Sequence, residues 1–187
     1  MTEGGRNPTQ WPHRLEVRTA PFQGACRGSI PLGVAMTQRK IIESFTLASG
    51  YGFLSNFHTS TIYVGGKSYP SVEHAYQAAK TLDDDVKETI RKAKSPGEAK
   101  KLGKCVQLRS DWDAVKVDLM RGFLRQKFDS PFLRHQLLQT GDAELIYGNT
   151  WNDRFWGVCR GTGQNWLGKL LMQLREEFQV TDSLEQP

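Results

Sequence analysis

An acid and an amine in one segment have a spacing that suits catalysis. Glu73 and Lys80 lie seven residues apart in the segment 71–80, SVEHAYQAAK. If this segment is one helix, seven steps of about 100° bring both side chains to the same face, roughly 10 Å apart along the axis. That gap is too long for a tight ion pair, but it suits a sugar-sized ligand held between an acid/base group and a nucleophilic amine. A solvated helix face with two ordinary charges is the alternative interpretation.

A second segment, 148–168, combines glycines, tryptophans and an aspartate between aromatic residues (GNTWNDRFWGVCRGTGQNWLG). Asp153 is suited to general acid/base work or to stabilising an oxocarbenium ion, and equally to capping a turn. The paired glycines at 161 and 163 precede a predicted helix, where backbone N–H groups can approach a phosphate; a loop that needs positive φ explains them equally well. The tryptophans could stack on a base or cover a sugar, or else pack in the core; they are Trp151, Trp156 and Trp166.

Other reactive side chains form no recognisable site. The histidines at 58, 74 and 135 lack metal-ligand spacing, and His74 is predicted to point away from the face of Glu73 and Lys80. We therefore predict neither a metal ion nor another cofactor. Cys159 is interpreted as a small buried apolar residue. The run of three aspartates at 83–85 is interpreted as a solvated helix junction.

The composition indicates one globular domain outside the membrane. A chain of 187 residues with 38% hydrophobic residues can bury a core. It contains no apolar run near the ~20 residues that span a bilayer, and no secretory segment at its start. Three widely spaced cysteines predict no disulfide framework. We expect an intracellular protein, cytoplasmic or nuclear, with organelle targeting left open.

The positive charge is concentrated at the N-terminus. Of the net charge of +5, residues 1–40 carry +4 and residues 41–187 carry +1. Residues 1–40 are also rich in proline and without period, so we predict a largely disordered basic extension. Such an arm adds affinity for phosphates, whereas the near-neutral remainder does not indicate a duplex-binding face.

The remaining chain predicts a mainly α domain with a small β element of short strands. It occupies residues 41–180, followed by a disordered tail at 181–187. The first helix is expected from Pro70–Ser71 to about 83–85, a second starts at the Ser95-Pro96-Gly97-Glu98 cap, and the last covers about 165–178. A helix from 110–113 is expected to bury Trp112, Val115, Leu119, Phe123 and Phe128. A helix from Ser130–Pro131 is expected to bury Phe132, Leu133, Leu137 and Leu138. Strands are expected at 41–46, 61–64 and 144–147, with a hairpin turn at Gly65–Gly66.

Four segments together resemble the NADAR (YbiA-like) family over about residues 43–179. They are the segments 53–57 (FLSNF), 71–80, 152–157 (NDRFWG) and 163–172 (GQNWLGKLLM). The resemblance implies a mostly helical fold and N-glycosidase activity. Some members cleave the base–ribose bond of phosphorylated riboflavin-pathway intermediates, and others remove ADP-ribose from guanine in nucleic acid.

The resemblance also implies site residues. The catalytic set is Glu73, Lys80 and Asp153, and the substrate-binding set is Ser55, Asn56, Phe57, Trp151, Trp156, Gly157, Gly163, Asn165 and Trp166. Tyr147 departs from the family pattern, because many members carry Glu there. If that carboxylate contributes to catalysis in them, the mechanism of this chain must depend on Glu73 and Asp153.

We expect an ADP-ribosyl-guanine glycohydrolase that acts on ADP-ribosylated DNA or RNA, with Lys80 able to form a Schiff base with the ribose. An N-glycosidase for riboflavin-pathway intermediates is the alternative within the same class. A non-catalytic module that binds ADP-ribose or a nucleotide is the alternative from another class. The basic arm, and the lack of an attached riboflavin-pathway domain, favour the ADP-ribosylated substrate.

Overall fold

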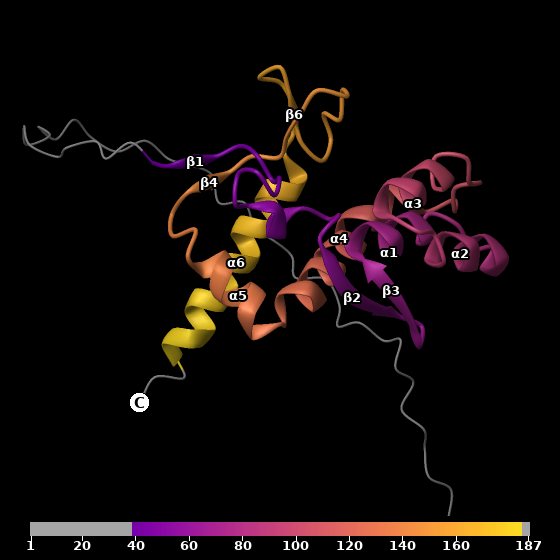
Figure 1. The fold of residues 1–187 in the computed structure, drawn as a ribbon, viewed down its shortest axis with the longest axis horizontal. Helices are drawn as coiled ribbons and strands as arrows, with labels where there is room; N and C mark the ends of the chain where they lie inside the picture. Colours follow the sequence, from indigo (N-terminus) through magenta and orange to yellow (C-terminus); the bar gives the residue numbers. More distant parts are fainter. Residues whose placement is uncertain (1–38, 185–187) are drawn as a thin grey trace, which may run out of the picture. The chain divides into compact units, whose positions relative to one another are not determined.

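The computed structural model describes residues 39–184, which form six α-helices and three two-stranded sheets (Figure 1). Residues 1–38, and with them almost all of the predicted extension, lie outside the described residues. The helices are α1 Val72–Ala78, α2 Asp84–Arg91, α3 Pro96–Leu102, α4 Trp112–Phe128, α5 Pro131–Leu138 and α6 Trp166–Leu184, with a 3-10 turn, η1, at Gly52–Leu54. The strands are β1 Ile41–Ile42, β2 Thr59–Val64, β3 Lys67–Ser71, β4 Glu144–Leu145, β5 Gly148–Asn149 and β6 Val158–Cys159. The predicted fold class, mainly α with short strands, is confirmed.

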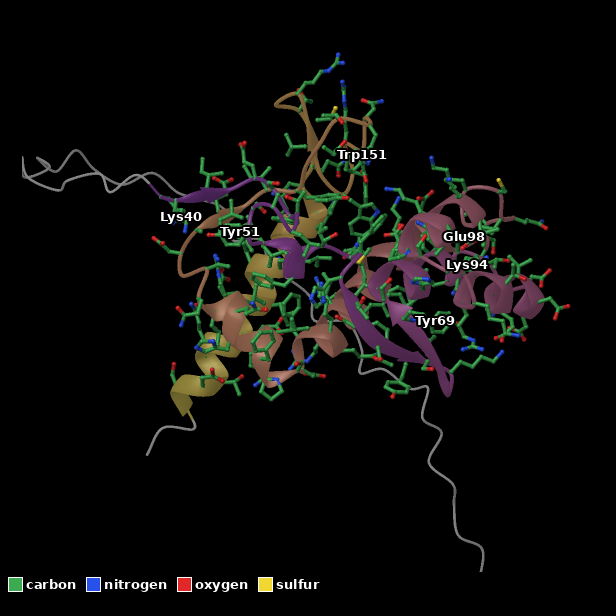
Figure 2. All side chains as sticks on the ribbon, viewed as in Figure 1. Lys40, Tyr51, Tyr69, Lys94, Glu98 and Trp151 are labelled. Atoms are coloured by element: carbon green, nitrogen blue, oxygen red, sulfur yellow. The ribbon has the colours of Figure 1, made fainter. Side chains whose placement is uncertain are left out.

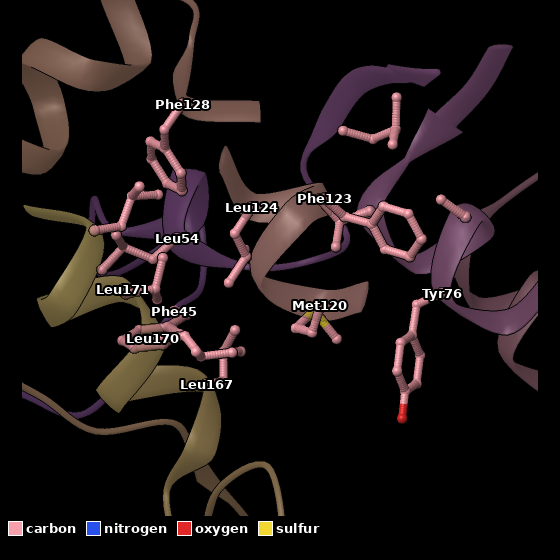
Figure 3. Packing of buried hydrophobic residues seen from close by; sticks show 14 of the residues in the cluster. Phe45, Leu54, Tyr76, Met120, Phe123, Leu124, Phe128, Leu167, Leu170 and Leu171 are labelled. Carbon is pink, nitrogen blue, oxygen red and sulfur yellow. The ribbon is translucent and has the colours of Figure 1, made fainter. Parts of the chain in front are cut away.

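Helix α4 is the central element of the core. It contacts α1, β2, α5 and α6, and its buried side chains Met120 and Leu124 lie between those of α6 and α1 (Figure 3). The predicted start of α4 near residues 110–113 is confirmed. Because α4 packs against elements from both ends of the described chain, it holds α1 and α6 in one hydrophobic cluster.

The helix predicted from Pro70 to about residue 84 is too long. Helix α1 ends at Ala78, after which the N–H groups of Lys80 and Thr81 bond to carbonyls three residues back. Asp83 then begins α2, because its carboxylate accepts hydrogen bonds from two N–H groups of the next turn, at 2.9 and 3.0 Å. The three aspartates thus form a helix junction, as predicted, but α2 was not expected.

Short strands and turns follow the predictions in part. The β2–β3 hairpin is confirmed, with positive φ at both Gly65 and Gly66. The strand predicted at 41–46 covers only 41–42, because hydroxyl–backbone bonds from Ser49 fold the following residues into a turn. The strand predicted at 144–147 likewise stops at Leu145.

Two predictions about helix faces and ends need correction. The Ser95 and Ser130–Pro131 helix starts are confirmed, but Phe132 is exposed, since it lies in the first turn of α5 on the solvent side. The disordered tail was predicted from residue 181, whereas α6 continues to Leu184. The hydroxyls of Thr181 and Ser183 donate to carbonyls four residues back, which satisfies them within the helix.

Among residues 39–184, no helix has the length and apolar character needed to cross a membrane.

A lysine is buried in the core beside the 53–57 segment. Lys127 on α4 is 2% exposed, and its Nζ donates to the carbonyl oxygen of Ser55 at 2.7 Å. Burial lowers the pKa of Lys127 from 10.5 to about 7. The folded protein therefore holds this amine neutral at pH values where the unfolded chain would protonate it.

We predict that Lys127 makes stability rise with pH. Between pH 7 and 10.5 the unfolded state binds one more proton at this side chain than the folded state does. From pH 7 to 9, the free energy of unfolding of the wild type should increase by about 1–2 kcal/mol more than that of Lys127→Met. Urea unfolding at both pH values measures the difference. Lys94→Met, at an exposed lysine, is the matched control; an equal pH response in wild type and Lys127→Met would contradict the prediction.

Candidate active site

Glu73 is held at the start of α1 by three neighbouring segments. The hydroxyl of Ser71 caps the helix, and the Glu73 N–H donates to the carbonyl oxygen of Asn56 at 3.1 Å. Its carboxylate accepts a hydrogen bond from Gln77 Nε2 at 2.8 Å. The side chain is only 6% exposed. The 53–57 segment and the first turn of α1 are therefore joined directly through the backbone of the residue whose carboxylate the sequence singles out.

The surroundings of Glu73 favour its neutral form. Burial raises the pKa of Glu73 above its ordinary value of 4.5. The hydrogen bond from Gln77 and the charges of Lys100 and Lys80 oppose this rise, whereas the charge of Asp153 adds to it. A carboxyl group that keeps its proton to higher pH is suited to donating it.

Lys80 comes to the site from beyond the end of α1. The prediction that it shares one helical face with Glu73 is wrong, since α1 stops two residues earlier. Its half-buried Nζ donates to the carbonyl oxygen of Gly103 at 3.3 Å and lies 5.6 Å from the centroid of the Tyr76 ring. Burial lowers the pKa of Lys80, the Glu73 charge opposes this, and two neighbouring lysines add to it. A lowered pKa increases the fraction of nucleophilic free amine.

Close packing at the end of α3 makes the Lys80 contact possible. Gly103 follows α3, and a Cβ at this position would collide with the Gln77 side chain. Only glycine therefore lets the carbonyl of residue 103 reach Lys80 while Gln77 stays on Glu73. His74, by contrast, bonds to Ser71 and to the backbone of residue 93, as its predicted packing role requires.

Asp153 is fixed within the 148–165 loop, which lies at the N-terminal end of α6 (Figure 1). Asn149 bonds to the backbone of Asp153 through both ends of its amide, at 2.8 and 3.0 Å. The Asp153 carboxylate accepts a hydrogen bond from the Trp156 N–H at 2.9 Å. It therefore caps a turn, the alternative role that its position suggests. Its charge also raises the pKa of Glu73, so the carboxylate belongs to the same electrostatic site.

One hydrogen bond joins this loop to α1. Trp156 Nε1 donates to the hydroxyl oxygen of Tyr76 at 3.0 Å, and the two rings meet edge to face with centroids 5.4 Å apart. Tyr76 is buried, and burial raises its pKa. The two segments that the sequence marks as chemical thus meet, bringing the catalytic candidates into one neighbourhood.

An exposed aromatic pair with a lysine between its rings borders the site. Lys100 Nζ lies 5.2 Å from the centroid of the Trp151 ring and 5.8 Å from that of the Phe57 ring. Trp151 is 56% exposed and projects from the loop toward α3 (Figure 2). The Lys100 charge also lowers the pKa of Glu73. This trio can therefore contact a planar or anionic group that reaches Glu73.

Several predicted substrate contacts are instead committed to the backbone. The Asn165 amide bonds to the backbone of Leu145 and Tyr147, at 2.8 and 3.0 Å, and its φ is +53°. A Cβ at Gly157 would collide with Tyr147, and one at Gly163 would collide with Gly157. These residues shape the loop, and their predicted contact with substrate stays a prediction. Gly161 has φ +75°, which is the alternative explanation for the paired glycines.

Other predicted substrate contacts are Ser55, Asn56, Phe57 and Trp166, and they are less committed to the backbone. The Ser55 hydroxyl accepts a hydrogen bond from the Phe57 N–H at 3.1 Å. Asn56 is half-buried, and among residues 39–184 its buried Oδ1 has no hydrogen-bond partner. Trp166 is half-buried and stacks on Phe155. Asn56 is thus the predicted contact with a free acceptor beside the Glu73 backbone.

Three residues at the site were not predicted from the sequence. Tyr76 and Gln77 lie inside the 71–80 segment, where their spacing from Glu73 is the available signal. Lys100 gives no such signal, because only the tertiary packing of α3 brings it to the site. Within residues 39–184, no group of three or more His, Cys, Asp or Glu side chains could hold a metal ion.

Comparisons with known proteins agree with this fold. The model of the NADAR domain matches residues 44–179. The N-glycosidase YbiA of Escherichia coli is 42% identical over 147 residues, covering 76% of this chain and 91% of that protein. The riboflavin biosynthesis protein VVA0006 of Vibrio vulnificus is 42% identical over 134 residues, 69% of this chain and 36% of that protein. The NMR structure of E. coli YbiA matches with a TM-score of 0.71 and 40% identity, over 81% of this chain and 92% of that one.

We predict that Glu73→Gln stabilises the protein at neutral pH. Because the folded-state pKa of Glu73 is raised, the stability it contributes is complete below pH 4.5 and is lost as the pH rises through the folded-state value. Gln is isosteric, stays neutral and keeps an acceptor for Gln77. At about pH 7.5 its melting temperature should exceed that of wild type by at least about 2 °C, and near pH 4 the two should coincide.

Thermal unfolding followed by circular dichroism measures both values. Glu176→Gln, at an exposed position of α6, is the control and should leave the melting temperature unchanged. A Glu73→Gln protein that melts below wild type at about pH 7.5 would contradict the interpretation of Glu73 as a carboxyl group held neutral by burial.

Proposed function

The chain belongs to the NADAR domain family, and on that premise we propose that this N-glycosidase removes ADP-ribose from ADP-ribosylated guanine in nucleic acid. The observation that supports the proposal is the Trp156–Tyr76 hydrogen bond, which joins the loop that carries Asp153 to the helix that carries Glu73. A pair of carboxyl groups beside the scissile bond is the usual requirement for cleaving a glycosidic bond.

The charges beside Glu73 support a substrate with two adjacent phosphates. Lys100 and Lys104 both act on the pKa of Lys80, and Lys100 acts on that of Glu73 as well. A cluster of amines next to one buried carboxyl group suits a diphosphate better than a single phosphate. The exposed ring of Trp151 offers a stacking surface for the adenine or for the target base.

The two carboxyl groups have different tasks. Cleavage of the bond makes C1′ of the ribose positive and leaves negative charge on the departing base. Glu73, whose pKa is raised by burial, donates a proton to the base, and the Asp153 carboxylate stabilises the ribose. The two carboxyl groups thus divide the work, with Glu73 as the acid and Asp153 as the stabilising group.

Lys80 supplies the nucleophile. Its free amine attacks C1′, the bond from C1′ to the base breaks, and the bonding electrons leave with the base, which takes the Glu73 proton. The new ammonium returns one proton to Glu73, and its nitrogen lone pair then opens the C1′–O4′ bond. O4′ takes that proton and a protonated imine forms. Water adds to C1′, the bond to Lys80 breaks, and free ADP-ribose and the amine result.

Riboflavin-pathway intermediates are the second candidate substrate. The name of the V. vulnificus relative, a riboflavin biosynthesis protein, favours them. They share with ADP-ribosyl-guanine a base–ribose bond and at least one phosphate, so the same side chains could act on them.

We predict that the protein releases ADP-ribose from DNA carrying ADP-ribosylated guanine. Mass spectrometry of the products detects it, and a parallel reaction with the phosphorylated riboflavin intermediate is the comparison. A higher kcat/KM for the riboflavin intermediate would transfer the proposal to the second substrate. Tight binding of the modified DNA without release of ADP-ribose would identify a non-catalytic module.

We further predict that Lys80→Ala and Lys80→Arg lose turnover, by more than about a hundredfold, while the melting temperature stays close to that of wild type. Borohydride added during turnover should trap a sugar adduct on Lys80 of the wild type, located by peptide mass. Lys87→Ala is the matched control, since this lysine pairs with Asp84 on α2 away from the site. An active Lys80→Ala protein, or a wild type without an adduct, would exclude the covalent route.

A further inference from the structure

A row of aromatic rings leads away from the candidate site. Tyr76 contacts Trp156 with centroids 5.4 Å apart, Trp156 contacts Phe155 at 5.0 Å, and Phe155 stacks on Trp166 at 6.1 Å. The first contacts are edge to face, whereas Phe155 and Trp166 are nearly parallel, with 28° between their planes. The row therefore begins at the buried Tyr76 and ends in two half-buried rings.

Lysines lie over the outer rings. Lys116 Nζ on α4 is 4.1 Å from the centroid of Phe155, and Lys169 Nζ on α6 is 5.4 Å from that of Trp166. These four residues are called the aromatic–lysine row below. Lys116 also pairs with Asp113, a 90% exposed carboxylate that is free to move aside. Each of the two outer rings thus has a lysine amine beside it.

A hydrogen bond orients the ring of Trp166, and the ring stays partly exposed. Its Nε1 donates to Gln164 Oε1 at 2.8 Å, and Gln164 is itself exposed. Packing alone does not explain why two half-buried rings from a loop and a helix start should each carry a lysine from a different helix. The arrangement matches how proteins hold single-stranded nucleic acid, with bases stacked on rings and phosphates near amines. Paired bases in a duplex do not offer free faces to such rings.

We propose that the aromatic–lysine row binds the nucleotides next to the target base in a single strand of nucleic acid. This inference rests on the proposed function, and it deepens it: the substrate is a strand, with the modified nucleotide at Glu73 and Lys80 and its neighbours along Phe155 and Trp166. Phe155, the first ring of the aromatic–lysine row, contacts Trp156, which bonds to the same Tyr76 that Lys80 covers. The row is therefore connected to the site through Trp156.

Binding of unmodified single-stranded DNA tests the row apart from catalysis. The probe is a fluorescein-labelled deoxythymidine strand of about 12 nucleotides, within the range that single-strand binding folds cover. Fluorescence anisotropy gives Kd from about 50 to 200 mM salt. We expect the double variant Lys116→Ala/Lys169→Ala to raise Kd about tenfold at the lower salt and to reduce the salt slope by about 1.4, the value for two lost phosphate contacts. Trp166→Leu should also weaken binding.

Arg121→Ala is the matched control, because Arg121 lies on the same helix as Lys116 and has the same i,i+3 pairing with an Asp. It should bind as wild type does. Three results would each overturn the proposal. The double variant could bind no more weakly than Arg121→Ala, or the wild type could bind duplex DNA as well as the single strand. Polyglutamate could also compete as strongly as the strand does. No turnover enters these measurements, so failure of the proposed function would appear separately, as binding without release of ADP-ribose from the modified strand.

Discussion

The hydrogen bond between Trp156 and Tyr76 determines whether the chain has one site or two unrelated segments. Its partners are 80 residues apart, one in the loop before α6 and one in α1. The contact joins the segment that carries Asp153 to the helix that carries Glu73, and the charge of Asp153 raises the pKa of Glu73. The bond has a buried phenol as acceptor, and an unpaired phenol there would carry a desolvation penalty of about 1–3 kcal/mol. The loop is thus held at α1 by more than ring packing.

Burial and charge compete at this site, and burial prevails for both reactive groups. Glu73 and Lys80 attract each other, which favours the charged forms, yet the pKa of Glu73 is raised and that of Lys80 is lowered. Desolvation explains the outcome: it outweighs the hydrogen bond that Gln77 donates to the carboxylate and the attraction of the Glu73 charge for the amine, both of which favour the charged forms. A straight helix through residue 80 would have set the amine on the same face of α1 as Glu73. The early end of α1 instead turns it toward α3 and out of water.

Local signals predicted the elements better than the contacts between them. Cap sequences such as Ser95-Pro96 located helix starts, since capping depends on residues within one turn. The end of α1 was missed because a run of apolar spacing does not reveal that Asp83 caps a new helix, α2, after it. For the site, the sequence identified Glu73 and Asp153 but not their supporting groups. Lys100 reaches the site through packing of α3, which periodicity cannot predict.

Tyr147 stands where the family resemblance leads one to expect a Glu. The candidate site therefore has two carboxylates, Glu73 and Asp153, and not three. The ring stacks on Phe45 with centroids 5.7 Å apart and meets Trp151 edge to face at 6.1 Å, so it links the core to the exposed rim. Burial and the charges of Glu73 and Asp153 raise its pKa, which keeps the hydroxyl neutral. A Glu in this place would add a third negative charge and raise the pKa of Glu73 further. A neutral tyrosine instead adds no charge beside Glu73 and Asp153, and it holds Trp151 by ring contact.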